Sequence, residues 1–342
     1  MGKFTLARFF QEQWGTRIPK PKTSAEGKTI IVTGGNIGLG FEAAKHIARL
    51  SPERLLITSR DAGRGEGARK KIEQKSSISV GVAPIDLSSF DSVRAFADGF
   101  GDGKLDCLLL NAGVSMRVYS ATKDGWESTI QVNYLSNALL SILLLPNLIK
   151  SSTPEVASRI VFVSSYAHYQ IKNLDDVKDS SNILKTLSDE KYCTERAMRL
   201  RYMLSKYLVG VFVRELSARL PSPTPVAVSA INPGFCHSSI LRNWEEIFII
   251  KVMLKSYAAL FARSTEMGSR TLVHAALDPE ERKFHNHYIS NCEIVEESDF
   301  LLSEEGRKVS ARIWTETIDV LKELDPRVEG IVSEYLSEPK TA

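Results

Sequence analysis

The chain has 342 residues, of which 43% are hydrophobic and 25% charged, a composition typical of an ordinary globular protein with a large core. The formal net charge is +3, and basic residues are concentrated in positions 1–28. The near-neutral remainder argues against a nucleic-acid-binding body. Four widely spaced cysteines form no CxxC pair, so we expect no metal site, no disulfide framework and a reducing, cytoplasmic location.

Membrane insertion is not expected. No uninterrupted run of about 18 apolar residues is present, and the first residues lack the apolar region of a signal peptide. The basic and aromatic start, MGKFTLARFFQEQW, is typical of a segment that rests on a membrane surface. A flexible arm, or one packed on the body, fits the same residues, so peripheral membrane contact stays open.

Short apolar runs alternate with helical patterns along the chain. Strands are predicted at 28–33, 55–58, 79–84, 105–110, 158–163, 226–231 and near Tyr288, and helices at 41–50, 62–74, 92–100, 129–150 and 195–218. This alternation predicts an α/β fold, a Rossmann-type doubly wound parallel sheet covered on both faces. We expect a single domain at 28–325, preceded by a basic arm at 1–27 and followed by a tail at 326–342.

A glycine-rich turn joins the first strand to the first helix. It reads Thr33-Gly34-Gly35-Asn36-Ile37-Gly38-Leu39-Gly40. Here Gly34 permits the tight turn, Gly38 lets the backbone approach a pyrophosphate, and Gly40 allows close packing of helix and strand. Any tight turn between strand and helix can be rich in glycine, but this setting favours dinucleotide binding at the helix N-terminus. We expect Asn36, Ile37 and Leu39 to line the same site.

The end of the second strand indicates which dinucleotide binds. An acidic residue there would bind the ribose hydroxyls of NAD(H), but the chain has Ser59-Arg60. The guanidinium of Arg60 suits a phosphate, and Arg64 is a second basic candidate unless it is simply solvated. Asp61 is expected to cap the next helix. NADP(H) is therefore favoured over NAD(H).

With these residues in view, the chain resembles the short-chain dehydrogenase/reductase family. The matching pieces follow the family's order: Thr33–Gly40, Asp86-Leu87, Asn111-Ala112-Gly113, Asn133, Ser165, Tyr202-Met-Leu-Ser-Lys206 and Pro233-Gly234. Residues 171–176 and 265–271 are similar to the retinol-dehydrogenase-like branch and its fungal members in secondary metabolism. The resemblance implies hydride transfer between a nicotinamide and a carbon–oxygen centre.

Tyr202 is the expected proton donor and acceptor. Free tyrosine titrates near pH 10, and Lys206, one helical turn away on the same face, would lower the tyrosine pKa by its charge. The resemblance also implies that Lys206 binds the nicotinamide ribose, that Ser165 holds the substrate oxygen, and that Asn133 holds a water in the proton relay.

Four nearby residues offer competing interpretations. Ser164 competes with Ser165, and Tyr192 with Arg196 repeats the tyrosine–basic spacing as an apparent decoy. His168 is expected to be structural or to line the pocket rather than to act as an acid or base.

Further cofactor contacts are implied by the resemblance. Asp86 and Leu87 would contact the adenine, and the backbone of Asn111, Ala112 and Gly113 would lie along the cofactor, with Asn111 also joining two strands. Pro233, Gly234 and Ser238 would lie beside the nicotinamide.

Two segments depart from the shortest family pattern. Residues 168–194 form an insert before Tyr202, rich in polar residues, and we expect it to run over the active-site mouth. Residues 238–264 resemble a substrate lid, and their Trp, Phe, Ile and Met side chains favour a lipophilic substrate that is polyketide-, terpenoid- or retinoid-like. A membrane-surface segment or a buried helix fits the same residues.

Three functions follow, the first of which is favoured. It is an NADP(H)-dependent alcohol dehydrogenase or ketoreductase, acting as a monomer or homodimer. The alternatives are a non-catalytic NADP-sensing or scaffold protein, and an epimerase or dehydratase of the same family. Sensing proteins usually lose the catalytic Ser, Tyr or Lys, and all three are present here.

Overall fold

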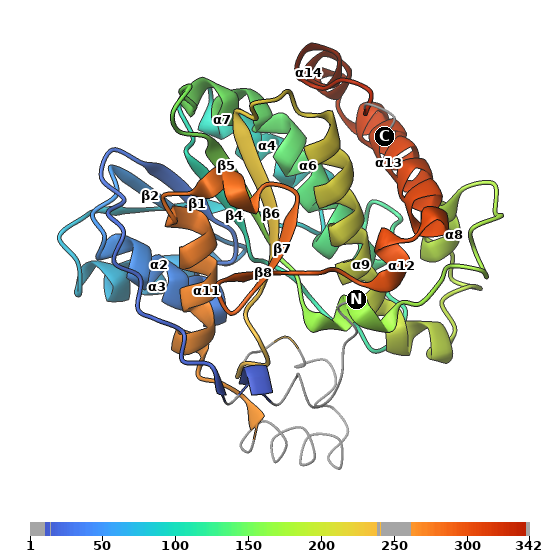
Figure 1. Ribbon diagram of the computed structural model, residues 1–342, viewed down its shortest axis with the longest axis horizontal. Helices are drawn as coiled ribbons and strands as arrows, with labels where there is room; N and C mark the ends of the chain where they lie inside the picture. Colours follow the sequence, from blue (N-terminus) through green and yellow to red (C-terminus); the bar gives the residue numbers. More distant parts are fainter. Residues whose placement is uncertain (1–10, 14, 238–239, 241–260, 340–342) are drawn as a thin grey trace.

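A computed structural model describes residues 11–13, 15–237, 240 and 261–339. Its centre is an eight-stranded sheet in the order β3-β2-β1-β4-β5-β6-β7-β8 (Figure 1). The strands are β1 (Thr29–Val32), β2 (Arg54–Ser59), β3 (Val80–Pro84), β4 (Cys107–Leu110), β5 (Ser158–Val163), β6 (Val226–Asn232), β7 (His287–Ser290) and β8 (Glu293–Val295). The first seven strands are parallel and β8 runs antiparallel to β7, which confirms the predicted doubly wound fold.

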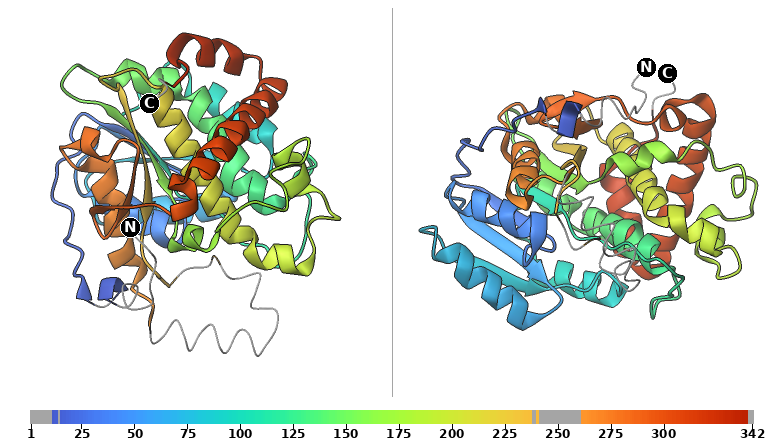
Figure 2. Two further views of the ribbon diagram at one scale, coloured as in Figure 1. Left: turned by 45° about the vertical axis from the view of Figure 1, so that its right-hand side comes forward. Right: turned by 90° about the horizontal axis from the view of Figure 1, so that it is seen from below.

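Helices cover both faces of the sheet. The helices are α2 (Gly38–Ala48), α3 (Ala62–Glu73), α4 (Phe90–Phe100), α5 (Ser128–Ile130), η1 (Gln131–Leu135), α6 (Ser136–Leu143), α7 (Leu145–Ser151), η2 (Tyr166–Gln170), α8 (Ile183–Ser188), α9 (Glu195–Arg219), α11 (Thr265–Leu277), η4 (Glu281–Phe284), α12 (Asp299–Leu302), α13 (Glu304–Leu324) and α14 (Arg327–Tyr335). Figure 2 shows helices on both sides of the sheet. One apolar core joins the sheet to α2, α3 and α11, and the other joins it to α4, α6 and α9. Neighbouring residues of β1 divide between the two cores, Ile31 into one and Ile30 and Val32 into the other, as alternating side chains require.

The segment predicted as one long helix at 129–150 is interrupted twice. A π-helical turn, η1, separates α5 from α6, and the axis bends by 50° between Ser128–Leu143 and Leu145–Ser151. Pro146 lies in the first turn of α7, where its missing N–H is tolerated but the preceding helix cannot continue through it. No single described helix is long and apolar enough to cross a membrane. The two helices of this bent pair, taken together, reach the required length and apolar composition. Its residues are largely buried in the protein core.

Part of the insert at 168–194 packs on the C-terminal helix α13. Its helix α8 has the fully buried apolar residues Ile183, Leu184 and Leu187, which the polar residues around them concealed in the sequence. The Leu184 N–H donates to Glu316 Oε2 of α13 at 3.0 Å, and Arg312 of α13 donates to the carbonyl of Lys178 at 2.6 Å. The apolar face of α8 therefore packs on α13, and that the rest of the insert runs over the active-site mouth stays a prediction.

The end of the chain is more ordered than the expected tail at 326–342. Helix α14 falls within this range, and Val328 at its start is fully buried. Helix α13 lies along α9, where the rings of Trp314 and Phe212 are 5.5 Å apart. The hydroxyls of Tyr134 and Thr317 share a buried 2.7 Å hydrogen bond. Helices α13 and α14 thus complete the core on the side of α6 and α9.

The described part of the N-terminal arm packs on the body. Ile18 and Ala25 are fully buried, and the side-chain amide of Gln13 donates to the carbonyls of Phe235 at 2.6 Å and Phe261 at 2.8 Å. The body-packed alternative therefore holds from residue 11 onward, in the part of the arm that the structure describes.

Candidate active site

The glycine-rich turn lies at the carboxyl edge of the sheet, between β1 and α2. Gly34 and Gly38 both have φ of +64°, a left-handed conformation that favours glycine. A Cβ on Gly40 would lie 2.4 Å from Asn111 Nδ2 and 2.6 Å from the carbonyl of Gly34, so this close approach requires glycine. The turn therefore has the local geometry that its sequence predicts.

The start of α2 is open toward an anion. Its N-cap residue, Ile37, makes no side-chain cap, and its first turn holds no acidic residue. Ile37 is also 55% exposed, while Leu39 packs beside α11 near Gly268. Free N–H groups at a helix N-terminus, beside glycines that leave room for a ligand, fit the pyrophosphate of a dinucleotide.

Asn111 joins the two central strands. Its Nδ2 donates to the carbonyl of Thr33 at 2.9 Å, and the Thr33 hydroxyl accepts from the N–H groups of Asn111 and Ala112 at 2.9 and 3.1 Å. A Cβ placed on Gly113 would lie 3.1 Å from Asn133 Oδ1 and 3.9 Å from Lys206 Nζ. This segment therefore runs from the glycine turn directly to the predicted catalytic residues.

Two arginines are exposed where β2 leads into α3. Ser59 is buried and its hydroxyl donates to the carbonyl of Asp61 at 2.7 Å, while Asp61 caps α3 by accepting from the Arg64 N–H. Arg60 and Arg64 are exposed, and neither forms an ion pair with the residues described. The guanidinium groups are thus free for a phosphate, whereas the Ser59 hydroxyl is already engaged.

The Asp86-Leu87 pair follows β3. Asp86 Oδ1 accepts from the N–H and hydroxyl of Ser88 at 3.0 and 2.7 Å. Leu87 is buried, and its carbonyl accepts from the Ser136 hydroxyl at 2.7 Å. Asp86 is thus half-buried in a fixed turn at the same edge of the sheet.

Ser165, Tyr202 and Lys206 come together where β5 meets α9. The Tyr202 hydroxyl is hydrogen-bonded to Ser165, and Lys206 Nζ lies 5.5 Å from the centre of the Tyr202 ring. Lys206 donates to the carbonyl of Val163 at 2.7 Å. Ser164, by contrast, is buried and points to the carbonyl of Lys206 at 3.5 Å, so the second serine is the one placed beside the tyrosine.

The titration of these groups is governed by burial. Burial raises the pKa of Tyr202 to about 12, and the hydrogen bond from Ser165 opposes the rise. Burial lowers the pKa of Lys206 to about 8. In the chain alone the Tyr202 pKa is therefore raised and not lowered as expected, because removal of the phenol from water outweighs the hydrogen bond with Ser165. At neutral pH Tyr202 is protonated and Lys206 is still charged.

Asn133 lies within the π-helical turn η1 and is buried. Its Oδ1 accepts from the Val114 N–H at 2.8 Å, and its Nδ2 donates to the Val114 carbonyl and the Ser205 hydroxyl, both at 2.9 Å. The Ser205 hydroxyl donates to the carbonyl of Tyr202 at 2.7 Å. Ser205 therefore links Asn133 to the catalytic helix, a role that no sequence signal indicated.

His168 and Tyr192 have structural surroundings. His168 Nδ1 is 2.8 Å from the carbonyl of Ser165, and its ring packs on Tyr169 and Tyr288. Burial lowers the pKa of His168 to about 4, so the ring is neutral at physiological pH. The Tyr192 hydroxyl donates to Asp176 at 2.5 Å, and Tyr192 precedes α9 altogether, which fits the interpretation of Tyr192 and Arg196 as a decoy.

The turn after β6 is held by the N-terminal arm. Gly234 has φ of +78°, and the next N–H, of Phe235, donates to Gln13 Oε1 at 3.1 Å. The guanidinium of Arg263 donates to the carbonyl of Gln13 at 3.2 Å and to Asn291 Oδ1 at 2.6 Å. These contacts fix Pro233-Gly234 at the site and were not indicated by the sequence. Ser238 and most of the expected lid at 238–264 lie outside the described residues.

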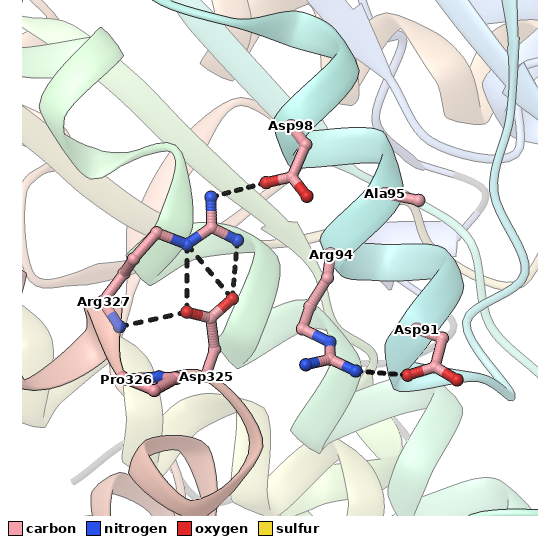
Figure 3. Close-up of a pocket in the computed structure, with 7 residues that line it drawn as sticks. All are labelled: Asp91, Arg94, Ala95, Asp98, Asp325, Pro326 and Arg327. Atoms are coloured by element: carbon pink, nitrogen blue, oxygen red, sulfur yellow. Dashed lines mark hydrogen bonds and ion pairs between the residues drawn. The ribbon is translucent and has the colours of Figure 1, made fainter.

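A surface cavity of about 550 Å³ lies elsewhere, between α4 and the start of α14 (Figure 3). Its charged side chains are paired with one another: Arg327 with Asp325 at 2.6 Å and with Asp98 at 2.5 Å, and Arg94 with Asp91. It holds none of the predicted catalytic residues. Within the residues that are described, no cluster of His, Cys, Asp and Glu could hold a metal ion.

Comparisons with known proteins show which family the chain belongs to. The sequence pattern of the short chain dehydrogenase family matches residues 28–175. A short chain dehydrogenase/reductase from Cryptosporiopsis sp. (dmxR8) is 34% identical over 96% of this chain and 99% of its own length. Another from Phaeosphaeria nodorum (phmF) is 33% identical over 92% of this chain and 93% of its own.

A solved structure also matches over most of the chain. The crystal structure of an uncharacterized protein from Mycobacterium paratuberculosis aligns with a TM-score of 0.62 and 26% identity, over 88% of this chain and 95% of that one. One assignment follows from the fold, from the glycine turn, from the tyrosine and lysine of α9, and from relatives matched along nearly their whole length. The chain belongs to the short-chain dehydrogenase/reductase family of oxidoreductases and resembles its fungal members.

Proposed function

We propose that this protein is an NADP(H)-dependent oxidoreductase that interconverts a ketone or aldehyde and an alcohol on a lipophilic small molecule. The observation that carries the proposal is the meeting of Ser165, Tyr202 and Lys206 beside the glycine turn. When bound, NADP(H) supplies or accepts the hydride.

The side chains divide the remaining work. Ser165 and Tyr202, already hydrogen-bonded to each other, hold the substrate oxygen, and Tyr202 gives it a proton during reduction or takes one during oxidation. Lys206, charged at neutral pH, holds the cofactor ribose and stabilises the phenolate that Tyr202 becomes when it donates. Asn133 and Ser205 tie the catalytic helix to η1 and belong to the relay that returns a proton to Tyr202.

Preference for NADP(H) is supported by the end of β2. Arg60 and Arg64 are exposed there, and Asp61 is engaged as the cap of α3. We expect Arg60→Ala to raise the Kd for NADPH at least about tenfold and to leave the Kd for NADH nearly unchanged, because a guanidinium–phosphate contact is lost only with NADPH. Cofactor fluorescence measures both constants.

Arg54→Ala is the matched control for this test. Arg54 is an exposed arginine at the other end of the same strand, so its removal changes the net charge equally but leaves the cofactor end of β2 intact. Equal losses of NADPH affinity in the two variants would contradict the proposed phosphate contact.

The reaction class is tested by following NADPH absorbance with a panel of lipophilic ketones, aldehydes and alcohols. Net consumption or formation of NADPH in step with product supports a dehydrogenase or ketoreductase. Conversion with no net change in NADPH would favour the epimerase or dehydratase alternative. Binding of NADPH with no conversion by the wild-type protein of any member of a broad panel would favour the sensing or scaffold alternative.

A further inference from the structure

We propose that the buried ion pair between Arg201 and Glu127 is a positioning element of the active site, which sets the register of α9 against the turn that carries Asn133. The proposal rests on the proposed function, since it assigns these two residues to the geometry of that site. Neither residue is among the motif residues by which the chain was first seen to resemble the family.

Both charges are removed completely from solvent. The side chains of Arg201 and Glu127 are 0% exposed, and Arg201 Nε lies 3.7 Å from Glu127 Oε2. Arg201 Nη2 also donates to Cys193 Sγ at 3.0 Å, and the guanidinium lies 5.8 Å from the centre of the Tyr192 ring. A pair this deeply buried adds little net stability, because desolvation of both ions offsets their attraction. Conformational specificity is the better explanation for its presence.

Glu127 fixes the start of the segment that leads to Asn133. Its two carboxylate oxygens accept from the N–H groups of Thr129 and Ile130 at 2.9 and 3.0 Å, so Glu127 is the N-cap of α5. The π-helical turn with Asn133 follows directly. The carboxylate therefore caps the helix start and lies at ion-pair distance from the arginine of α9, although Arg201 Nε and Nη1 have no hydrogen-bond partner among the described residues.

Arg201 and Ser205 lie one turn apart on the same face of α9. Arg201 meets Glu127, and Ser205 meets Asn133 at 2.9 Å, so α9 is fastened to the α5–η1 segment at two successive points. Tyr202 and Lys206 follow these two residues one position later and occupy the adjoining stripe of the helix. A shift of α9 along η1 would move both of them relative to Ser165 and Asn133.

Loss of the contact between Arg201 and Glu127 should lower kcat more than it weakens the binding of NADPH. A displacement of about 1 Å at reacting groups can cost on the order of 100-fold in rate, whereas the glycine turn and Arg60 lie on other elements and keep their contacts. We expect Arg201→Met to lower kcat by about 30-fold or more and to change the Kd for NADPH less than threefold. Arg201→Lys should be faster than Arg201→Met, because lysine keeps the positive charge although it lacks the paired N–H groups of the guanidinium.

A second buried pair of the same chemistry provides the control. Arg159 and Glu281 are each 5% exposed, with Arg159 Nη2 3.4 Å from Glu281 Oε2. Glu281, like Glu127, also accepts from a backbone N–H, that of Ala157 at 2.8 Å. Arg159 lies at the start of β5, at the end opposite Ser165. Arg159→Met should therefore lower the melting temperature without lowering kcat.

The experiment compares Arg201→Met, Arg201→Lys and Glu127→Gln with Arg159→Met and Glu281→Gln. Steady-state rates use NADPH and the panel ketone that the wild-type protein reduces fastest, and each kcat is read beside the melting temperature of the same variant. A kcat loss specific to the Arg201 and Glu127 variants supports the proposal. Equal effects of the two pairs at equal loss of melting temperature overturn it.

Amide hydrogen exchange tests the positioning role without a measurement of turnover. Peptides covering η1 and the start of α9 should exchange faster in the Arg201 and Glu127 variants and remain unchanged in the Arg159 and Glu281 variants. Unchanged exchange in both sets would overturn the positioning role even if the reaction were identified correctly. Failure of the wild-type protein on the ketone panel, with altered exchange, would instead count against the proposed function alone. If Arg201→Met does not fold, Arg201→Lys and Glu127→Gln decide the question.

Discussion

Ser164 and Ser165 are neighbours in the sequence with opposite surroundings in the structure. Ser164 faces the backbone of α9 and is buried, whereas Ser165 meets the Tyr202 hydroxyl. Successive residues of an extended chain point to opposite sides, so only one of the two can serve the site. The same burial that positions Tyr202 also raises the pKa of its phenol, which keeps the proton on the tyrosine until the reaction withdraws it.

Removal of the Tyr202 hydroxyl tests its role as proton donor and acceptor. Tyr202→Phe is expected to lower kcat by about 10²–10⁴-fold, because general acid catalysis contributes roughly that much, and to leave the Kd for NADPH within a few-fold. Tyr192→Phe is the control, since Tyr192 has the same spacing to a basic residue but donates to Asp176. Retained turnover in Tyr202→Phe would refute the assigned mechanism.

The lowered pKa of Lys206 should make the unfolding free energy depend on pH. Its pKa in the folded protein is about 8 against an unfolded value of 10.5, so between these values the unfolded chain binds more protons and stability rises with pH. Relative to Lys206→Met, the wild-type protein should gain roughly 3 kcal/mol in unfolding free energy as the pH rises from about 7 to above 10. Denaturant melts of both proteins across this range measure the difference. If the difference in unfolding free energy between the two proteins does not change with pH, burial does not lower the pKa of Lys206.

At the scale of elements, the sequence predicts the regular parts better than their interruptions. The apolar run at 129–150 predicts one helix, because the helical period alone does not reveal the π-helical turn that contains Asn133. Helix α8 is hidden for a different reason, since its three buried apolar residues lie among polar ones and the helix packs on α13. Pairing with an element more than a hundred residues away leaves no local signal.

Helix α13 should contribute strongly to stability. Trp314 is 5% exposed and lies against Phe212 of α9, with the Arg219 guanidinium 4.6 Å from its ring centre. Trp314→Ala is expected to lower the unfolding free energy by about 3–5 kcal/mol through lost burial and the cavity left behind. Urea denaturation measures the loss. Lys308→Ala, on the exposed side of the same helix, should change stability by less than about 0.5 kcal/mol, and an equally small effect of Trp314→Ala would show that α13 is only loosely attached.

For the whole molecule, the alternation of strands and helices was sufficient to predict the parallel sheet. Ordered motifs were sufficient to place Ser165, Tyr202 and Lys206 on the correct elements. The contacts of Gln13 and Arg263 at the site were beyond sequence reasoning, because both are ordinary polar residues until the fold brings them to Pro233-Gly234. The packing of α14, which lies in the range expected to be a tail, has the same origin.

Gln13 tests this long-range contact. Its amide accepts from the Phe235 N–H and donates to the carbonyls of Phe235 and Phe261, so Gln13→Ala leaves three backbone groups without that partner. We expect the Kd for NADPH to rise several-fold because the Pro233-Gly234 turn loosens beside the nicotinamide. Gln11→Ala, at an exposed position of the same arm, is the control. Cofactor fluorescence decides between the two, and equal Kd values for both variants would show that the arm does not support the turn.

The hydrogen bond between Tyr134 and Thr317 joins residues 183 positions apart. At a synthesis rate of about 5–20 residues per second, the ribosome needs on the order of 10–40 s to travel from one to the other. During that interval the apolar surface of α6 and α9 has no α13 to cover it, however well the preceding sheet has assembled. The nascent chain therefore exposes apolar surface to other proteins until its final helices emerge, and we expect co-expressed chaperones to raise its soluble yield.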